Sequence, residues 1–467
     1  MLPTDEELLG LPPRELVAII RSLEQRVAAL EEALRDAFRS KAPFSKGSPK
    51  PNPKKPGRRP GQGTFARRPE PQPTPNDEVH DIDVPLEVAK RQCPHCEVPL
   101  ETTNELATIE DIPPQPRRVI KRFTVEVGRC PVCGLAVRAK HPELGVHQCG
   151  ANAHQVGPLV TAQALALHSH SGLPLCRVPG VIAQMTGITI SQSALTQAAG
   201  SLCNDAGVMQ GHYAELREEL PQAAVLNTDD TGWRINGTLA FLMGFFTWHI
   251  AFYQVRRQHR HQEVIEVIGE GFAGMLGTDR GSSYEAGAFE AVEMQKCLCH
   301  ILKNLSTVEE TKTGRAKEFT TGLQATLRES ISLWREYREG KIGLEEYRRR
   351  GRELEERLTH QLRNRVLTDD DNQRLLDGIG RQHDRGRLTL FLRAPEIEPT
   401  NNRAERGLRP AVIARRVSQC SKNERGANTY AVMKTIFGTL DLRTDNVVGA
   451  FAALMRGGAF PPALRVG

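Results

Sequence analysis

The segment 222–258 reads QAAVLNTDDTGWRINGTLAFLMGFFTWHIAFYQVRRQ, and its composition is that of three consecutive β-strands. The parts 222–235, 237–249 and 250–258 are rich in β-branched and aromatic residues, and short turns separate them. One of these turns contains Asn236 and Gly237, a pair that favours tight hairpins. The sequence therefore predicts three strands that pair with their neighbours along the chain.

Further elements follow this segment in an order that indicates a fold. A helix at 261–270, a fourth strand at 274–281 and a candidate fifth strand at 293–301 come next. Three strands, a helix and another strand are the order of a ribonuclease H-like domain with a mixed sheet. We therefore expect a multidomain α/β protein that has such a catalytic core.

Two acids occupy matched positions in this core. Asp229 lies at the end of the first predicted strand and Asp279 ends the fourth, so adjacent central strands bring both carboxylates to one sheet edge. A third acid from a later helix would complete a site for two Mg²⁺ ions, which activate the attacking oxygen and stabilise the leaving one. The alternative is that each Asp only caps a strand or a turn, and strand order alone does not decide between the two.

The N-terminal region shows a heptad pattern. Residues 5–38 place Leu9, Leu16, Leu23 and Leu30 at one seam position, and Ile20, Val27 and Leu34 at the other. Leu at one position and mostly β-branched residues at the other favour a parallel two-stranded coiled coil. We expect a homodimer or a higher oligomer; the alternative is an amphipathic helix packed on the rest of the protein.

The excess positive charge is concentrated in one segment. The formal net charge is +6, yet residues 39–68 contain ten Lys or Arg and no acid. The Pro-rich segment 39–79 has little that could form a core, so it predicts a linker. Its Lys54, Lys55, Arg58 and Arg59 suit DNA phosphates, and the alternative is a solvated tether without a partner.

Four of the ten cysteines form two CxxC pairs, Cys93 with Cys96 and Cys130 with Cys133. Two such turns can hold one tetrahedral, structural Zn²⁺; the alternatives are a redox pair or chance. The other cysteines lack the spacing of a disulfide framework, and no secretory leader is evident. The longest apolar stretch, 239–252, is too short for a membrane span. We expect a cytoplasmic, nucleoid-associated protein with no membrane partner.

Residues 154–220 have a helical pattern that contains a candidate helix-turn-helix. In 181–199 a helix is followed by a turn at Thr186 and Gly187, and Ser191 is placed to cap a second helix. The second helix could enter a DNA major groove, although helical hairpins with Gly in the turn are common. The predicted domains are 1–38 (coiled coil), 39–79 (basic linker), 80–150 (zinc module), 151–220 (helical domain), 221–300 (core, first part), 301–395 (all-helical insertion) and 396–467 (core, second part).

Several motifs resemble the transposases of the insertion sequence 66 family. The segment 398–410, EPTNNRAERGLRP, is similar to the family's signature around its catalytic glutamate, which places that residue at Glu405. The family's Asp-Glu-Thr corresponds to 229–231, with Asp230 in place of Glu. Its Asp-Gly-x-x-x-Tyr corresponds to 279–284, with the Gly displaced by one position, and its Cys-x-x-His-x-x-Arg/Lys run corresponds to 297–303.

The resemblance implies a DDE transposase in which Asp229, Asp279 and Glu405 bind two Mg²⁺ or Mn²⁺ ions. Such an enzyme cuts the 3′ end of a mobile element and joins it to target DNA. Its expected partners are DNA, at both element end and target, and accessory proteins of the same element. The DNA contacts expected near the acids are His300, Lys303, Arg406, Arg409, Arg415 and Arg416. The alternatives are a catalytically idle, domesticated DNA-binding regulator and a ribonuclease H-like nuclease that cuts without joining.

Overall fold

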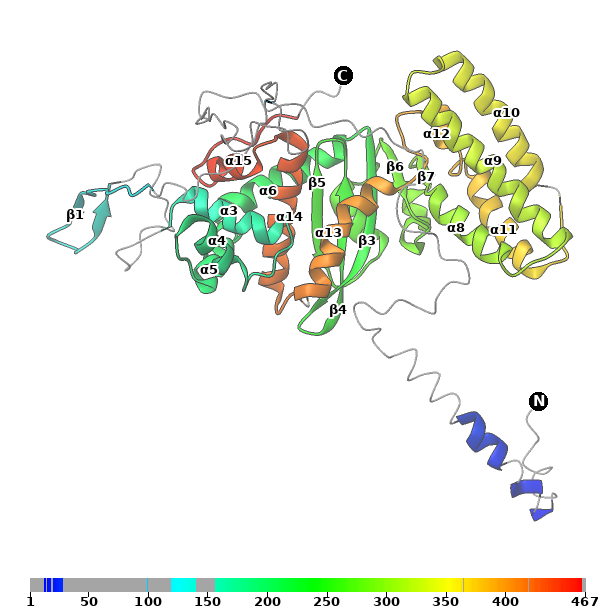
Figure 1. Ribbon diagram of the computed structural model, residues 1–467, viewed down its shortest axis with the longest axis horizontal. Coiled ribbons are helices and arrows are strands. Elements are labelled where there is room, and N and C mark those ends of the chain that lie inside the picture. The colour runs from blue at the N-terminus through cyan, green and yellow to red at the C-terminus, as the bar shows by residue number, and fades with distance from the viewer. Residues whose placement is uncertain are drawn as a thin grey trace. The chain divides into compact units, whose positions relative to one another are not determined.

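A computed structural model describes residues 156–463 except 364 and 419, residues 119–139, residue 99, and residues 12–27 except 14, 18 and 19. The chain divides into two compact units, Met1–Pro113 and Pro114–Gly467 (Figure 1). In the first unit residues 20–27 are helical, and Ile20, Leu23 and Val27 are exposed. The exposed apolar stripe agrees with the predicted seam, and dimerisation stays a prediction. The predicted linker 39–79 lies outside the described residues.

In the second unit a small hairpin carries one of the CxxC pairs. Strands β1 (Val127–Arg129) and β2 (Ala136–Arg138) pair antiparallel, and Cys130 and Cys133 lie in the turn between them. The Cys130 amide donates to the Leu135 carbonyl at 2.8 Å, which closes the turn. The other predicted zinc ligands, Cys93 and Cys96, lie outside the described residues, so the zinc module stays a prediction.

Four helices precede the main sheet: α3 (Pro158–Ser169), α4 (Val178–Thr186), α5 (Gln192–Leu202) and α6 (Val208–Glu219). The turn between α4 and α5 is built as the sequence predicts. Gly187 has a left-handed backbone that ends α4, and the Ser191 side chain accepts the Ala194 amide at the start of α5. The predicted helix, turn and N-cap are therefore confirmed, while DNA recognition by α5 stays a prediction.

The main sheet has five strands in the order β5-β4-β3-β6-β7. Their bounds are β3 (Val225–Ile235), β4 (Thr238–Phe246), β5 (Ala251–Arg256), β6 (Met275–Thr278) and β7 (Met294–Lys296). The first three pair antiparallel, and β6 and β7 add parallel to β3, which makes the sheet mixed. Asn236 and Gly237 both have positive φ, as the tight β3–β4 hairpin requires. The predicted mixed α/β fold and its first four strands are confirmed.

The fifth predicted strand, 293–301, is wrong in its second half. Strand β7 ends at Lys296, and helix α8 (Leu298–Glu309) begins two residues later. The Cys297 amide still donates to the Thr278 carbonyl of β6 at 2.8 Å. After this bond the chain turns into a helix whose apolar residues pack with the insertion helices.

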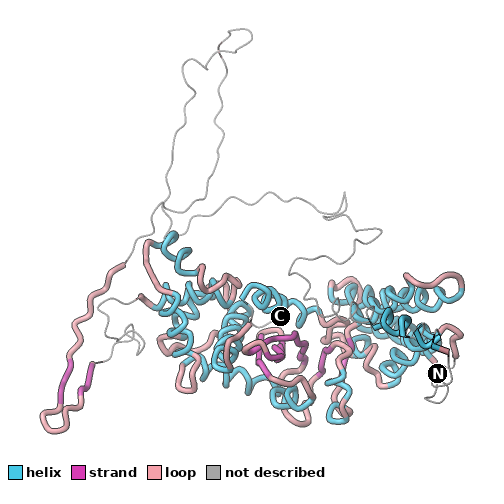
Figure 2. The backbone as a smooth tube through the Cα atoms, turned by 90° about the horizontal axis from the view of Figure 1, so that it is seen from below, coloured by secondary structure: helices cyan, strands magenta, loops and turns pink. Residues whose placement is uncertain are grey.

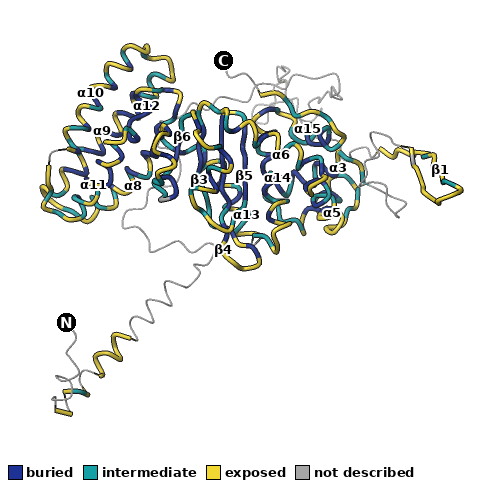
Figure 3. The backbone as a smooth tube through the Cα atoms, turned by 180° about the vertical axis from the view of Figure 1, so that it is seen from behind, coloured by how far each residue is buried: buried dark blue, intermediate teal, exposed yellow. Residues whose placement is uncertain are grey.

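Helices cover both faces and one edge of the sheet. Helix α13 (Asn402–Ser418) packs on β3 and β4, whereas α7 (His261–Ile268) contributes to the core on the opposite face. Helix α14 (Glu424–Arg443) lies along the edge strand β5, where Thr435 and Thr439 accept the amides of Tyr253 and Ala251. These threonines satisfy backbone donors that an edge strand would otherwise leave unpaired. Figure 3 shows the buried strands within a more exposed helical periphery.

The helical insertion has a hydrophobic core of its own. It contains α9 (Arg315–Arg338), α10 (Leu344–Leu362), α11 (Asp370–Asp384) and α12 (Leu390–Arg393), and α8 joins the same core. In Figures 1 and 2 the main sheet lies between this group and the group α3–α6. The chain continues after α14 with α15 (Val447–Leu454). None of the helices in the described part of the chain is long and apolar enough to cross a membrane.

Candidate active site

The prediction that Asp229 ends its strand is wrong, because β3 continues to Ile235 and Asp229 lies within it. The pleat of β3 places Asp229 on the face covered by α13. Its neighbours at alternate positions contact that helix or the loop before it: Asn227 bonds Asn401, and Thr231 accepts from Arg415. Successive side chains of a strand point to opposite faces, so Asp229 shares this side and Asp230 does not. Asp230 instead forms an ion pair with His259 at 3.3 Å.

Strand β6 brings Asp279 to the same end of the sheet. Asn227 of β3 pairs in parallel register with Gly277 of β6, so Asp229 and Asp279 each lie two residues further along. Asp279 Oδ1 accepts the Gly281 amide at 2.8 Å, and Asp229 Oδ1 accepts the Asp230 amide at 2.9 Å. Within the described residues, no hydrogen bond involves the second oxygen of either carboxylate.

Helix α13 supplies Glu405 from its first turn, and Asn401 fixes where that turn begins. The Asn401 side chain accepts from Asn227 at 3.0 Å and donates to the Thr228 carbonyl at 2.8 Å. Its backbone amide donates to the Cys297 Sγ at 3.2 Å, and its carbonyl accepts the Glu405 amide. This buried residue therefore connects β3, the start of α8 and the helix of Glu405.

Sequence reasoning missed the role of Asn401, although the Asn-Asn pair before a helix signals a helix start. It also missed the two glycines that let these elements approach. A Cβ on Gly277 would lie 2.3 Å from Asn227 Nδ2, and one on Gly407 would lie 2.2 Å from Phe246 Cε1. Only glycine allows α13 and β6 to approach β3 and β4 this closely.

The acids interact electrostatically. Burial first, and then the negative charges of Asp279, Asp230 and Glu405, raise the pKa of Asp229 to about 7, although the Asp230 amide opposes the shift. Burial also raises the pKa of Asp230, against the effect of His259. Asp229 is therefore close enough to Asp279 and Glu405 to be affected by their charges, although the three acids are distant in sequence.

The donor atoms of this trio fit Mg²⁺. All are carboxylate oxygens, which are the ligands that hard divalent cations prefer. The raised pKa of Asp229 shows that a negative charge is unfavourable at this position. A bound cation would offset both the burial of this charge and its repulsion by the neighbouring acids. Among the described residues, the donor atoms found within 4.8 Å of one another are those of Glu405, His300 and Cys297, so metal binding by Asp229, Asp279 and Glu405 together stays a prediction.

Helix α8 places His300 beside Glu405. His300 Nδ1 lies 3.7 Å from Glu405 Oε1, and the side chains of both residues are 41% exposed. The neighbouring Cys297 thiol, together with the charges of Glu405 and Asp279, raises the pKa of His300 to about 9. His300 is therefore a cation at neutral pH in this arrangement. Lys303, one turn further along, is exposed on the same helix.

The predicted arginines of α13 fall into two groups. Arg406, Arg409 and Arg416 are exposed, and their spacing of three and seven puts them on one side of the helix. Arg415 is only partly exposed and donates to Thr231 Oγ1 at 3.0 Å and to the Gly232 carbonyl. Lys54, Lys55, Arg58 and Arg59 lie outside the described residues.

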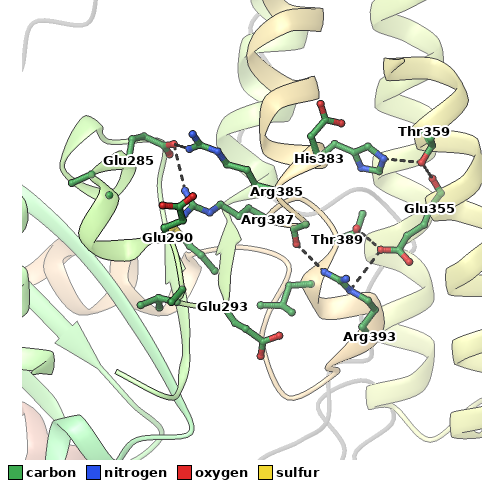
Figure 4. Close-up of a pocket in the computed structure, with 18 residues that line it drawn as sticks. Glu285, Glu290, Glu293, Glu355, Thr359, His383, Arg385, Arg387, Thr389 and Arg393 are labelled. Atoms are coloured by element: carbon green, nitrogen blue, oxygen red, sulfur yellow. Dashed lines mark hydrogen bonds and ion pairs between the residues drawn. The ribbon is translucent and has the colours of Figure 1, made fainter. Parts of the chain in front are cut away.

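A cavity of about 890 Å³ lies between the core and the insertion, and none of the three acids lines it. Figure 4 shows Glu285 of the short helix η4 (Ser282–Glu285) directed toward Arg385 and Arg387 at the wall of this cavity. Glu285 also pairs at 2.8 Å with Lys296, whose side chain is fully buried. Lys296 Nζ contacts Thr278, the residue before Asp279. This network, which sequence reasoning missed, joins the insertion to the strand of the second acid.

The chain matches a protein-family model. The model described as Transposase IS66 family matches residues 153–429, more than half of the chain. The matched segment includes all three acids, His300 and the helical insertion. A search among curated proteins found no match.

Proposed function

The chain belongs to the IS66 family of transposases, and from this premise we propose that Asp229, Asp279 and Glu405 form a two-metal DDE site that cuts and joins DNA. One observation carries the proposal: Asp229 and Asp279 lie at matching positions along the parallel pair β3 and β6, and Asn401 bonds the start of the Glu405 helix to Thr228, the residue before Asp229. Two Mg²⁺ or Mn²⁺ ions bound there would activate the attacking oxygen and stabilise the leaving oxygen.

The remaining residues of the site would bind and orient DNA. Arg406, Arg409 and Arg416 form an exposed basic row on the helix of Glu405, which suits contacts to successive phosphates. The cationic His300 beside Glu405 is suited to contact the scissile phosphate. The reaction we propose has two steps: water releases a 3′-OH at the element end, and that hydroxyl then attacks a target phosphodiester.

The architecture supports the proposed fold and accessory modules. The strand order β5-β4-β3-β6-β7, with three antiparallel strands followed by two parallel ones, is the arrangement we infer to be ribonuclease H-like. In the proposed zinc module, the backbone amides of Cys133 and Val132 lower the pKa of Cys130, which favours the thiolate that binds metal. Pairing through residues 1–38 would let one assembly hold two element ends.

The proposal is tested with a labelled element end, a target DNA and Mg²⁺. Loss of one metal ligand removes several kcal/mol of transition-state stabilisation, so Asp229→Asn, Asp279→Asn and Glu405→Gln should each slow cleavage by about a thousandfold or more. Asp205→Asn is the control, because it removes one exposed carboxylate that lies outside the site, between α5 and α6.

Other outcomes of this assay identify the alternatives. Wild-type activity in both cleavage and joining, lost in the three variants, supports the transposase. Cleavage without a joined product would indicate a nuclease, and binding of DNA without cleavage would indicate a regulator. Equal activity of Glu405→Gln and the wild type would reject the assignment of the third acid.

A further inference from the structure

Three donor atoms of different chemistry converge beside the proposed catalytic trio. The Sγ of Cys297, a ring nitrogen of His300 and a carboxylate oxygen of Glu405 all lie within 4.8 Å of one another. The 3.7 Å between His300 Nδ1 and Glu405 Oε1 is too long for a hydrogen bond. His300 Nδ1 is also buried and lacks a hydrogen-bond partner in the described part of the chain.

The local structure explains why these atoms meet. Cys297 precedes α8 and His300 lies in its first turn, so the Cys-x-x-His spacing directs both side chains to one side. Asn401 then places the helix of Glu405 against this turn, because its amide bonds the Cys297 sulfur at 3.2 Å. The Cys297 side chain is buried, whereas His300 and Glu405 are partly exposed, which leaves an approach for a small cation from solvent.

The donor set selects among metals. Zn²⁺ binds sulfur at about 2.3 Å and nitrogen or oxygen at about 2.0–2.2 Å in tetrahedral geometry, so its nitrogen and oxygen ligand atoms lie about 3.3–3.6 Å apart. The observed separation of 3.7 Å between His300 Nδ1 and Glu405 Oε1 is slightly longer, so small side-chain shifts would bring the two atoms to ligand positions. Thiolate and imidazole favour zinc-like transition metals, whereas Mg²⁺ takes oxygen ligands. A site with three protein ligands leaves the fourth position to water.

We propose that Cys297, His300 and Glu405 bind a divalent transition metal such as Zn²⁺, and that this ion inhibits the enzyme by engaging the carboxylate of Glu405. The inhibitory part rests on the proposed function, whereas the metal site stands on the geometry alone. A carboxylate of Glu405 that binds Zn²⁺ is no longer free to bind Mg²⁺ in the geometry that cleavage needs. A further cation at this distance would also repel metal bound at Asp229 and Asp279.

Metal uptake by the full chain tests the site. The reduced protein is dialysed against metal-free buffer and titrated with Co²⁺, whose thiolate charge-transfer absorption reports a bound cysteine. We expect the wild type to take up one more Co²⁺ than Cys297→Ser or His300→Ala. Cys299→Ser is the matched control: Cys299 is an exposed thiol outside the three-donor group whose side chain contacts that of Cys297, so this variant separates loss of the contact from loss of the ligand. The Cys pairs of the predicted zinc module are present in every variant, so the Co²⁺ that they bind does not affect the difference between variants.

Equal Co²⁺ uptake by the wild type and His300→Ala would overturn the metal site. The His300→Ala variant alters a partly exposed residue and is expected to fold.

The inhibition is tested with Mg²⁺-dependent cleavage. Zn²⁺ at about ten times its dissociation constant should slow the wild type and Cys299→Ser about tenfold, and Cys297→Ser far less. Equal inhibition of all three would overturn the competition. Extra Co²⁺ uptake by a wild type that does not cleave DNA would reject the proposed function and leave the metal site standing.

Discussion

Asn401 donates its side-chain amide to the backbone carbonyl of Thr228 across 2.8 Å, so the residue before the helix of Glu405 is bonded to the residue before Asp229. This bond fixes the start of α13 on β3 independently of any metal. The second side-chain bond, from Asn227, and the amide bond to Cys297 add two further restraints. The third acid is therefore positioned by a neighbour that has no charge of its own.

Replacing this residue should reduce stability and activity together. Asn401→Ala leaves the buried Asn227 amide without its acceptor, at a cost of about 1–3 kcal/mol in the free energy of unfolding. We also expect kcat for cleavage to fall while the affinity for DNA changes little, because α13 loses a restraint near Glu405. Urea unfolding and single-turnover cleavage measure the two effects. Asn402→Ala alters the adjacent residue, and an equal loss in that variant would contradict the role of Asn401.

Asp229 should make the metal-free protein less stable at neutral pH than at acidic pH. Its folded-state pKa is about 7, above the usual value, so the proton binds the folded state more tightly than the unfolded state. The resulting stability is fully present below the unfolded pKa of about 4 and is lost as pH rises toward 7. Asn mimics the protonated form, so Asp229→Asn should be more stable than the wild type at pH 8 and similar to it near pH 4.

Urea unfolding in EDTA at the two pH values checks this expectation. Asp205→Asn, an exposed carboxylate between α5 and α6, controls for the removal of one negative charge. Added Mg²⁺ should stabilise the wild type at pH 8 and Asp229→Asn much less, because binding to the folded state shifts unfolding by mass action. A wild type that is more stable than Asp229→Asn at pH 8 without metal would contradict the raised pKa.

Gly407 should be irreplaceable for steric reasons. A Cβ there would lie 2.2 Å from Phe246 Cε1, so Gly407→Ala must displace either α13 or the ring, and Glu405 moves with the helix. We expect about 1–3 kcal/mol of destabilisation and a marked loss of cleavage. Gly322→Ala is the control, since its nearest atom is a Gln361 side-chain nitrogen at 3.7 Å, and this variant should keep or gain stability. Recovery of cleavage in Gly407→Ala with Phe246→Leu would confirm that the clash causes the loss.

Lys296 should be sensitive to replacement although it touches neither DNA nor metal in the proposed mechanism. Its ammonium is fully buried between Glu285 and Thr278, and burial lowers its pKa against the effect of Glu285. Lys296→Met leaves Glu285, which is 31% exposed, with Arg385, Arg387 and Gln382 as partners. We expect the free energy of unfolding to fall by about 2–4 kcal/mol. This is somewhat less than for a fully buried ion pair, because Glu285 is partly exposed and keeps other partners.

Thermal and urea unfolding measure this effect, and a double variant separates its causes. If the ion pair with Glu285 is responsible, Lys296→Met should destabilise the wild type more than it destabilises Glu285→Gln. Equal destabilisation in both backgrounds would assign the loss to packing around the Lys296 stem instead.

The sequence predicted the parts of this fold that depend on local patterns. Alternation and turn residues identified β3, β4 and β5, and Ser191 marked the start of α5. The pattern failed at 293–301, where an apolar run suits both a strand and a helix, and the change at Cys297 depends on tertiary contacts with Thr278 and Asn401. Local periodicity contains no information on such contacts.

The site likewise contains residues that the sequence predicts and residues that only the structure identifies. Asp229 and Asp279 follow from strand order, whereas Glu405 is separated from Asp279 by the insertion and was assigned through a resemblance. Asn401 and Lys296 could not be predicted, because their roles arise from partners more than ten residues away in sequence. The ion pair of Asp230 with His259 likewise required the structure, since two adjacent aspartates do not reveal which of them faces α13.

The arginines of α13 should differ in what they do, although the sequence presents them as one basic run. Arg406, Arg409 and Arg416 are exposed, so replacing any one by Ala should weaken DNA binding of all sequences and reduce the slope of log K against log [salt] by about 0.9. Arg415 donates to Thr231 and Gly232, so Arg415→Ala should instead lower the free energy of unfolding by about 1.5–3 kcal/mol. Fluorescence anisotropy across a salt series and urea unfolding distinguish the two behaviours. If Arg415→Ala reduced the salt slope without any loss of stability, its bonds to β3 would not be its main role, and the basic row on α13 would have four members.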